Sequence, residues 1–285
     1  MEAATQSRVR VRKMMLEDIA SARELSREQK WPHRTADWEF LFQHGTGFVA
    51  DQDGEVVGTT LCWEQGPTAA SLGMVIVSPR CQGQGLGSRL MEAALGELGD
   101  RTVVLNSTEE GQPLYRKFGF EPAGSILQHQ GIVDIVPLAE LRPNERVRPK
   151  GRNDRAVVAE LDRLASGMDR SEIISAILPG SRGVMFDSNN STVGFALVRR
   201  FGRGFAVGPT VAPDAVAAKA LISHWLGSKV GKFCRLDIPE SSGLSSWLEK
   251  RGLPCVGQVT TMVRGRPLHA TAGAKLFSLI SQALG

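Results

Sequence analysis

Three glycines at alternate positions form the group most suited to binding an anion. Gly83, Gly85 and Gly87 lie between an apolar run ending at Val77 and a stretch of helical spacing that begins near Leu86. Glycine lets the backbone approach a ligand closely, and the first N–H groups of a helix have no partner within it. These donors and the helix dipole attract negative charge. The turn contains no acidic residue, so we expect an anion there.

Two common nucleotide-binding motifs do not fit this turn. A P-loop needs Gly-Lys-Ser/Thr, whereas Leu86-Gly87-Ser88 follows Gly85. A dinucleotide-binding turn needs G-x-G-x-x-G, and Ser88 stands in place of its third glycine. The pattern that does fit the turn is Gln82-x-x-Gly85-x-Gly87. A glycine turn that binds no ligand is the structural alternative.

The only tyrosine of the chain is a second candidate for chemistry. Tyr115 lies in a short helix predicted over residues 112–118, with Pro113 in its first turn. A phenol, with a pKa of about 10, can donate a proton in a reaction. Alternatively, Tyr115 fills the core with its ring and exposes only its hydroxyl.

The elements that must position these residues occur twice in the same order. The order is one strand, two helices, a run of strands, and then helix, strand, helix and strand, which indicates an internal duplication. Strands are predicted at 8–13, 48–50, 55–63, 71–77, 101–106, 123–130, 131–137, 183–187, 191–199, 205–207, 233–238 and 256–263. Helices are predicted at 17–29, 37–45, 86–98, 112–118, 154–165, 170–177, 213–226 and 244–250.

The length and composition fit two domains without a membrane span. The chain has 285 residues, 42% of them hydrophobic, and residues 141–153 have the composition of a linker. We therefore expect domains at 1–140 and 154–285. The net charge is +4 with scattered Lys and Arg, which disfavours a nucleic-acid surface. Four dispersed cysteines and no signal-peptide pattern favour a metal-free, cytoplasmic protein.

Two motifs in order resemble the GNAT N-acetyltransferase superfamily. The first runs Val77-Ser78-Pro79-Arg80-Cys81-Gln82-Gly83-Gln84-Gly85-Leu86-Gly87, and the second combines Asn106 with Leu114-Tyr115-Arg116-Lys117-Phe118-Gly119-Phe120. The resemblance covers most of residues 8–137, and the second half resembles the degenerate C-terminal half of tandem GNAT proteins. It implies an α/β (α+β) fold of two GNAT-like domains, each a mixed, mostly antiparallel sheet flanked by helices.

The resemblance also implies acetyl-CoA as the cosubstrate, without a metal. Tyr115 would protonate the departing CoA thiolate, and Asn106 would hydrogen-bond the pantetheine arm or a water. The strand 74–77 would offer backbone groups to the same arm and an N–H to the acetyl oxygen. The implied acetyl-CoA contacts are Val75, Ile76, Val77, Gln82, Gly83, Gln84, Gly85, Leu86, Gly87, Ser88, Asn106 and Tyr115.

The general base and the acceptor site stay open. Many relatives place a Glu on the strand before the glycine turn, but residues 71–77 contain no carboxylate. In the loop 31–35, where this family usually closes over the acceptor, His33 could be a base or relay and Arg34 could pair with a substrate carboxylate. Trp31 and Trp38 could form an apolar wall. A surface histidine and tryptophans packed in the core are the alternatives.

The second half lacks the glycine turn. Residues 208–214 place Pro209, Pro213 and Asp214 where a pyrophosphate would lie, so this half should not bind acetyl-CoA. Asp162, together with residues 169–170, could contact substrate; an ordinary helix cap beside a solvated arginine is the alternative.

The sequence therefore predicts direct acetyl transfer from acetyl-CoA to a primary amine of a small metabolite. A non-catalytic acyl-CoA-binding regulator, an acyltransferase for another acyl chain, and a protein amine as acceptor are the alternatives. We expect a monomer or homodimer that binds neither nucleic acid nor membrane.

Overall fold

The computed structural model describes residues 9–137, 139–271 and 273–285. It divides into two compact units, the first comprising residues up to Glu64 with Leu72–Asp100, and the second Gln65–Ser71 with Arg101–Gly285. The division falls between the glycine turn and Tyr115, not in the segment 141–153 expected as a linker. That segment contains strand β7 (Glu145–Pro149).

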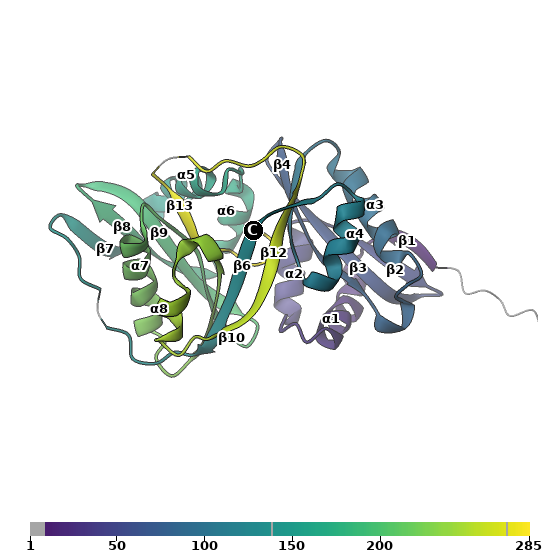
Figure 1. The fold of residues 1–285 in the computed structure, drawn as a ribbon, viewed down its shortest axis with the longest axis horizontal. Helices are drawn as coiled ribbons and strands as arrows, with labels where there is room; N and C mark the ends of the chain where they lie inside the picture. The colour runs from purple at the N-terminus through teal and green to yellow at the C-terminus, as the bar shows by residue number, and fades with distance from the viewer. Residues whose placement is uncertain (1–8, 138, 272) are drawn as a thin grey trace, which may run out of the picture. The chain divides into compact units, whose positions relative to one another are not determined.

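The first unit is a sheet with three α-helices among its described residues (Figure 1). Strands β1 and β2, and β2 and β3, pair antiparallel. Helix α1 buries Ile19, Ala22 and Leu25, the spacing of an amphipathic helix. Its elements are β1 (Val9–Lys13), η1 (Leu16–Asp18), α1 (Ile19–Glu28), α2 (Thr35–Gln43), β2 (Thr46–Gln52), β3 (Glu55–Gln65), β4 (Ala69–Val77), η2 (Pro79–Cys81) and α3 (Leu86–Leu98).

The second unit has the strand order β5-β12-β6-β11-β10-β9-β8-β7, with β13 beside β10 and the first residues of β4 beside β5. Helix α7 packs on β8, β9 and β10. The unit contains β5 (Thr102–Ser107), η3 (Glu109–Gly111), α4 (Gln112–Lys117), β6 (Glu121–Ile132), β7, η4 (Arg152–Asp154), α5 (Arg155–Ser166), α6 (Ser171–Ile177), β8 (Ser181–Ser188), β9 (Ser191–Phe201), β10 (Gly204–Ala212), α7 (Ala215–Gly227), β11 (Phe233–Pro239), η5 (Glu240–Ser242), α8 (Ser245–Glu249), β12 (Cys255–Arg264) and β13 (Lys275–Ser278).

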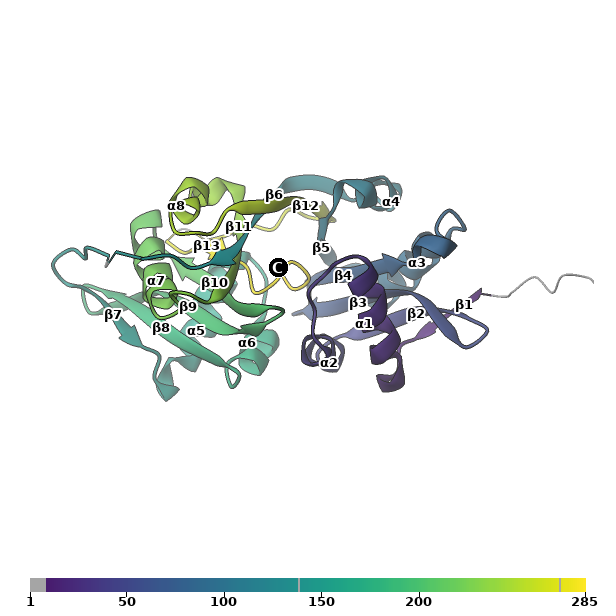
Figure 2. The same cartoon turned by 90° about the horizontal axis from the view of Figure 1, so that it is seen from below.

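Strands β6 and β12 connect the end of the first sequence half to the second half. Strand β12 lies between β5 and β6, and β6 lies between β12 and β11 (Figure 2). Thr261 of β12 is opposite Asn106 of β5, and His129 of β6 is opposite Leu236 of β11. Because of this exchange, residues 101–137 pack with the second half of the chain. Sequence order and compact units therefore differ.

Two expected strands are one strand in the structure. The predicted break between 130 and 131 is absent, and β6 runs from Glu121 to Ile132. Gly131 allows close packing within this strand, because a Cβ there would collide with the carbonyl oxygen of Gly252. The short strand β13 was not predicted at all.

Near the start of the first copy, one arginine binds two aspartates, an arrangement that we call the arginine clamp. Arg12 on β1 donates from Nη1 to Asp18 Oδ2 at 2.7 Å and from Nε to Asp51 Oδ2 at 2.9 Å. Burial raises the pKa of Asp18, but hydrogen bonds from Arg12 and the Met15 N–H outweigh it, and the net pKa is lowered. The Gly54 N–H and Arg12 likewise lower the pKa of Asp51.

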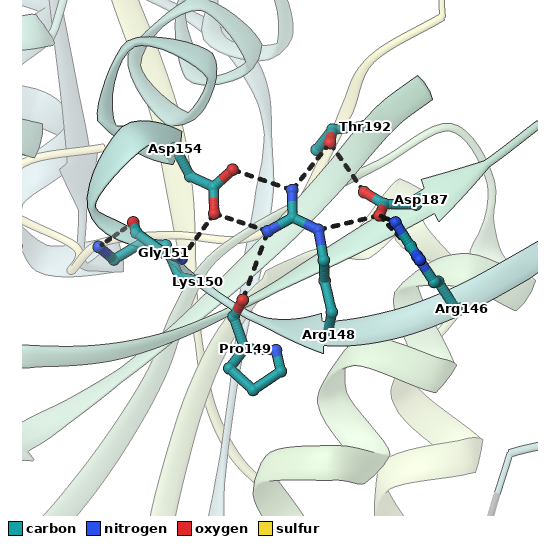
Figure 3. A network of polar contacts seen from close by, with 8 residues as sticks. All are labelled: Arg146, Arg148, Pro149, Lys150, Gly151, Asp154, Asp187 and Thr192. Carbon is teal, nitrogen blue, oxygen red and sulfur yellow. Dashed lines mark hydrogen bonds and ion pairs between the residues drawn. The ribbon is translucent and has the colours of Figure 1, made fainter. Parts of the chain in front are cut away.

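The second copy repeats this clamp (Figure 3). Arg148 on β7 donates from Nη1 to Asp154 Oδ2 at 2.7 Å and from Nε to Asp187 Oδ2 at 2.9 Å. The hydrogen bond from Arg148 lowers the pKa of Asp154. Burial raises the pKa of Asp187, but bonds from Thr192, Arg148 and Arg146 bring it below its usual value. One clamp in each half, with the same distances, supports the duplication.

Candidate active site

The glycine turn precedes helix α3 in the first unit. Gly83 and Gly85 both have φ of +75°, a left-handed conformation that favours glycine. Gly85 is the N-cap of α3 and provides no side chain to cap it, and residues 82–85 are exposed. The first N–H groups of α3 therefore face solvent without an intrahelical acceptor. The turn has the geometry of an anion site.

The side chains around this turn leave anion binding to the backbone. Gln82 donates from Nε2 to Val77 O at 3.2 Å, which braces the turn against the end of β4. Arg80 pairs with Glu55, and Arg89 donates from Nη2 to Val9 O at 3.0 Å. Since no carboxylate lies within the turn, no negative charge opposes an anion there.

Strand β4 is distorted at Met74, three residues before the end of the strand. Met74 has φ of +54°, which is unusual for a residue with a side chain. Thr59 of β3, fully buried, donates its hydroxyl to Met74 O at 2.8 Å. Such strained positions persist only when the surroundings hold them, and they cluster at functional sites. Sequence reasoning missed Thr59 and this distortion, because nothing in the run 71–77 marks an irregular residue.

The predicted acetyl-CoA contacts on β4 alternate in exposure. Val75 and Val77 are half-buried, whereas the Ile76 side chain is buried. A Cβ at Gly58 would lie 3.0 Å from Ile76 O, so glycine lets β3 approach β4 closely. Any contact from Ile76 to a ligand would use its backbone.

Asn106 lies at the end of β5 in the second unit, and both polar atoms of its side chain are bonded. Its Nδ2 donates to Gln282 O at 2.8 Å, and its Oδ1 accepts from Thr261 Oγ1 at 2.7 Å. A contact to a pantetheine arm or a water would replace one of these bonds. That contact stays a prediction.

Tyr115 of α4 is 8% exposed. Its ring makes an edge contact with Phe120 at a centroid distance of 6.1 Å. A Cβ at Gly111 would lie 3.0 Å from Tyr115 Cε2, so the ring also packs against the chain before α4. Burial raises the pKa of the hydroxyl above its usual value of 10. The phenol is therefore protonated at neutral pH, the state that a proton donor requires.

The loop between α1 and α2 brings His33 close to the tryptophans of the first unit. Ring centroids lie 6.0 Å apart for Trp31 and His33 and 6.4 Å apart for His33 and Trp38. Trp38 is fully buried, and its indole N–H donates to Ser26 Oγ at 3.1 Å. Trp38 therefore packs in the core, as the alternative to a substrate-binding wall had it. Trp31 and His33 are half-buried.

Arg34 is held by a carboxylate of its own helix. It donates from Nε to Asp37 Oδ2 at 3.0 Å and from Nη2 to Asp37 Oδ1 at 2.7 Å, and its backbone N–H also donates to Oδ2 at 2.9 Å. Arg34 is the N-cap residue of α2. A substrate carboxylate would have to compete with this bidentate pair.

The second copy differs at the position of the glycine turn. Asp214 is the N-cap of α7, and its Oδ1 accepts from the Ala217 N–H at 2.9 Å. A capping carboxylate satisfies a donor and repels an anion. The prediction that this half has no acetyl-CoA site gains a structural reason here.

Strand β13 fills the region beside β10 in the second copy. β10 and β11 pair at Phe205–Cys234 and Ala206–Arg235, and farther along β10 its partner is β13, with Thr210 opposite Ser278. The Leu279 N–H donates to Asp237 O of β11 at 2.8 Å. Backbone groups at the ends of β10 and β11 are therefore hydrogen-bonded to another segment of the same chain.

Arg170 corresponds in its copy to Arg34, because each is the N-cap of the second helix. The side chain of Arg170 is fully buried and donates to Asp162 at 2.9 and 2.7 Å. The expectation of a solvated arginine was wrong. Asp169 caps locally, accepting from the Ser171 N–H at 3.1 Å.

Comparison with known proteins gives the same family for both halves. Two different models of the acetyltransferase (GNAT) domain match residues 43–122 and 158–278. An uncharacterized N-acetyltransferase of Bacillus subtilis, YitH, is 26% identical over 279 residues, covering 96% of this chain and 97% of that protein. The holothin acyltransferase of a Pseudoalteromonas species is 23% identical, covering 88% and 86%.

A crystal structure from Pyrococcus horikoshii, described as an acetyltransferase, has the same fold. It superposes with a TM-score of 0.78 at 22% identity, covering 100% of this chain and 99% of that one. The chain belongs to the GNAT superfamily, in its tandem form. It is an acyltransferase by family.

Within residues 9–137, 139–271 and 273–285, no three His, Cys, Asp or Glu side chains gather as a metal site would require. In the same residues, no helix combines the length and the apolar character of a membrane span.

Proposed function

We propose that the chain transfers an acetyl group from acetyl-CoA directly to a primary amine of a small metabolite. The observation that carries the proposal is the exposed turn before α3, with two left-handed glycines and no opposing carboxylate. Its N–H groups, from residues 83 to 88, would bind the pyrophosphate of acetyl-CoA. The GNAT domain matched at residues 43–122 includes this turn.

Three groups of the chain take further roles in this proposal. Tyr115, kept protonated by burial, donates the proton that the departing thiolate needs. The distorted backbone at Met74, held by Thr59, presents β4 groups to the acyl donor. Asn106 binds the pantetheine arm in exchange for one of its present partners.

The acceptor amine must lose a proton before it attacks, and we assign this step to His33 or a water that it binds. The first unit places His33 between Trp31 and Trp38 on the loop after α1. Direct attack needs no covalent enzyme intermediate.

A different acyl donor is the second candidate. The relative from Pseudoalteromonas is named a holothin acyltransferase, a name that does not specify acetyl as the group transferred. This name leaves the length of the acyl chain to experiment.

The test is release of free CoA thiol when acetyl-CoA is mixed with each member of a panel of primary amines. Thiol release that requires an amine supports the proposal, and faster release with a longer acyl-CoA selects the second candidate. Tight acetyl-CoA binding without thiol release for any amine would identify a non-catalytic acyl-CoA-binding protein instead.

A further inference from the structure

The second unit contains a cavity of about 670 Å³. Strands β5, β12 and β6 line it together with the α5–α6 connection, the turn η5 and residues around β13. Its volume lies within the roughly 300–1,000 Å³ that small-molecule sites occupy. Asn106, an expected contact of the acyl donor, is one of the lining residues. A small molecule bound here would lie beside that residue.

Much of the lining is apolar. Apolar side chains come from β5, β12, β6, the α5–α6 connection and the segment from 268 to 279, and they include Val104, Ile126, Met168, Val263, Leu268 and Leu279. Removing an apolar body from water against such side chains is favourable at roughly 25 cal/mol per Å². The occupant should therefore carry a hydrocarbon or aromatic portion.

The charged lining is acidic in effect. Glu121 at the start of β6 and Glu240 of η5 line the cavity, and both are exposed to solvent. Among the described lining residues, Arg170 is the one cationic side chain, and Asp162 neutralises it with two hydrogen bonds. Arg170 also donates to Leu284 O. A bound carboxylate would meet two glutamates and no available arginine.

We infer that this cavity is the acceptor site, and that its substrate class is a cationic amine with an apolar body and no carboxylate. The inference rests on the proposed function. A primary alkylamine has a pKa of about 10 and is protonated at neutral pH, so Glu121 and Glu240 attract it. Amino acids carry the carboxylate that this lining repels.

Two matched probes test the substrate class by calorimetry on the full chain, with CoA present so that no turnover occurs. Phenethylamine and phenylalanine share the ring and the amine and differ in the carboxylate. We expect phenethylamine to bind at least tenfold more tightly. Equal affinity, or tighter binding of phenylalanine, would overturn the inference.

A pair of glycine variants locates the binding. Gly124 on β6 lines the cavity, and Gly257 on β12 does not; a Cβ on either meets nothing within 4 Å. Gly124→Phe puts a ring into open space at the cavity, and we expect it to weaken phenethylamine binding at least tenfold. Gly257→Phe, the control, should leave binding unchanged. Equal effects of the two variants would place the amine elsewhere.

A pair of glutamate variants tests the charge. Glu240→Gln should weaken phenethylamine binding roughly threefold, as expected for one solvent-exposed charge, whereas Glu249→Gln on α8, outside the cavity lining, should not. Phenethylamine bound at the cavity without thiol release from acetyl-CoA with any amine would refute the proposed function and leave the amine site standing. Thiol release that Gly124→Phe does not impair would refute the acceptor cavity and leave the function standing.

Discussion

The two copies share a structural clamp and differ where chemistry is proposed. Arg12 and Arg148 make the same two-carboxylate contacts at the same distances. The first copy then has a bare glycine turn before α3, whereas the second has Asp214 capping α7 and β13 alongside β10. Since the clamp is kept in both, its role is to hold the fold. The features found in one copy alone lie where we propose the acyl-donor site.

The same strand position shows how each copy uses its backbone. In the first copy, Gly73-Met74 departs from regular strand geometry, and Thr59 holds Met74 O. In the second, Gly208-Pro209 lies within β10 and not in the turn before α7, the β9–β10 register shifts there between Val207 and Thr210, and proline has no N–H to donate. The second copy therefore lacks a backbone donor at Pro209, and β13 pairs with the residues that follow it.

The largest effect should come from Tyr115→Phe. Removing the hydroxyl should lower kcat roughly 100-fold, the size expected of a general acid, with acetyl-CoA affinity unchanged. Because burial raises the pKa of Tyr115, its ionisation should not limit the rate below about pH 10. Steady-state kinetics and calorimetry together check this. An unchanged kcat would reduce Tyr115 to core packing.

The clamp variants Arg12→Met and Arg148→Met should each lower the free energy of unfolding by about 2 kcal/mol, because each removes charged hydrogen bonds from two buried aspartates. Asp51 keeps its ion pair with Arg10, and Asp187 keeps its bond from Arg146. Urea unfolding at pH 7 measures both. Arg163→Met, which breaks an exposed pair with Glu160, should change little. A large loss in one copy and none in the other would contradict a shared structural role.

The clamps also predict a pH dependence. The folded pKa values of Asp18, Asp51, Asp154 and Asp187 are lowered from 3.8. Their stabilisation is therefore complete above the unfolded value and is lost as the pH falls through the lower, folded values. Unfolding titrations below about pH 4 should show this loss in the wild type and less of it in the clamp variants.

Gly85→Ala should raise the Kd for acetyl-CoA roughly tenfold, because a methyl group enters the turn and a left-handed alanine costs about 1–2 kcal/mol. Gly99→Ala is the matched control: Gly99 ends α3, has φ of +61°, and would also place its Cβ in open space. Calorimetry on both variants separates backbone strain from ligand contact. The anion site would lie elsewhere if both changed the Kd equally.

Thr59→Val should give the smallest kinetic effect. Loss of the bond to Met74 O should lower kcat about fivefold, near the net value of one hydrogen bond, with little change in acetyl-CoA affinity. Thr60→Val is the control, since the Thr60 hydroxyl is buried with no hydrogen-bond partner in the described residues. A matching loss in Thr60→Val would mean general destabilisation and not positioning.

Local patterns were enough to predict the helices, most of the strands, the duplication and the glycine turn. Backbone conformation at Gly83 and Gly85 follows from the residue type itself, so the sequence carried that information. The exchange of β6 and β12 could not be predicted, because it depends on pairing between strands far apart in the chain. Strand β13 has four residues and gains its stability from β10, which no local pattern reveals.

The hydrogen-bond partners of individual side chains could not be predicted from the sequence either. Arg34 and Arg170 were candidates for substrate contact, and each is paired with an aspartate. The pairing of Arg170 with Asp162 spans the connection between two helices, and helix spacing alone does not specify it. Trp38 went to the core for a similar reason, since its partner Ser26 lies on another helix.

The most direct measurement is the stoichiometry of acetyl-CoA binding to the full chain by titration calorimetry. The account predicts one molecule per chain, bound at the turn before α3, and no binding by the second copy. Two molecules per chain, or no detectable binding of any CoA thioester, would contradict it.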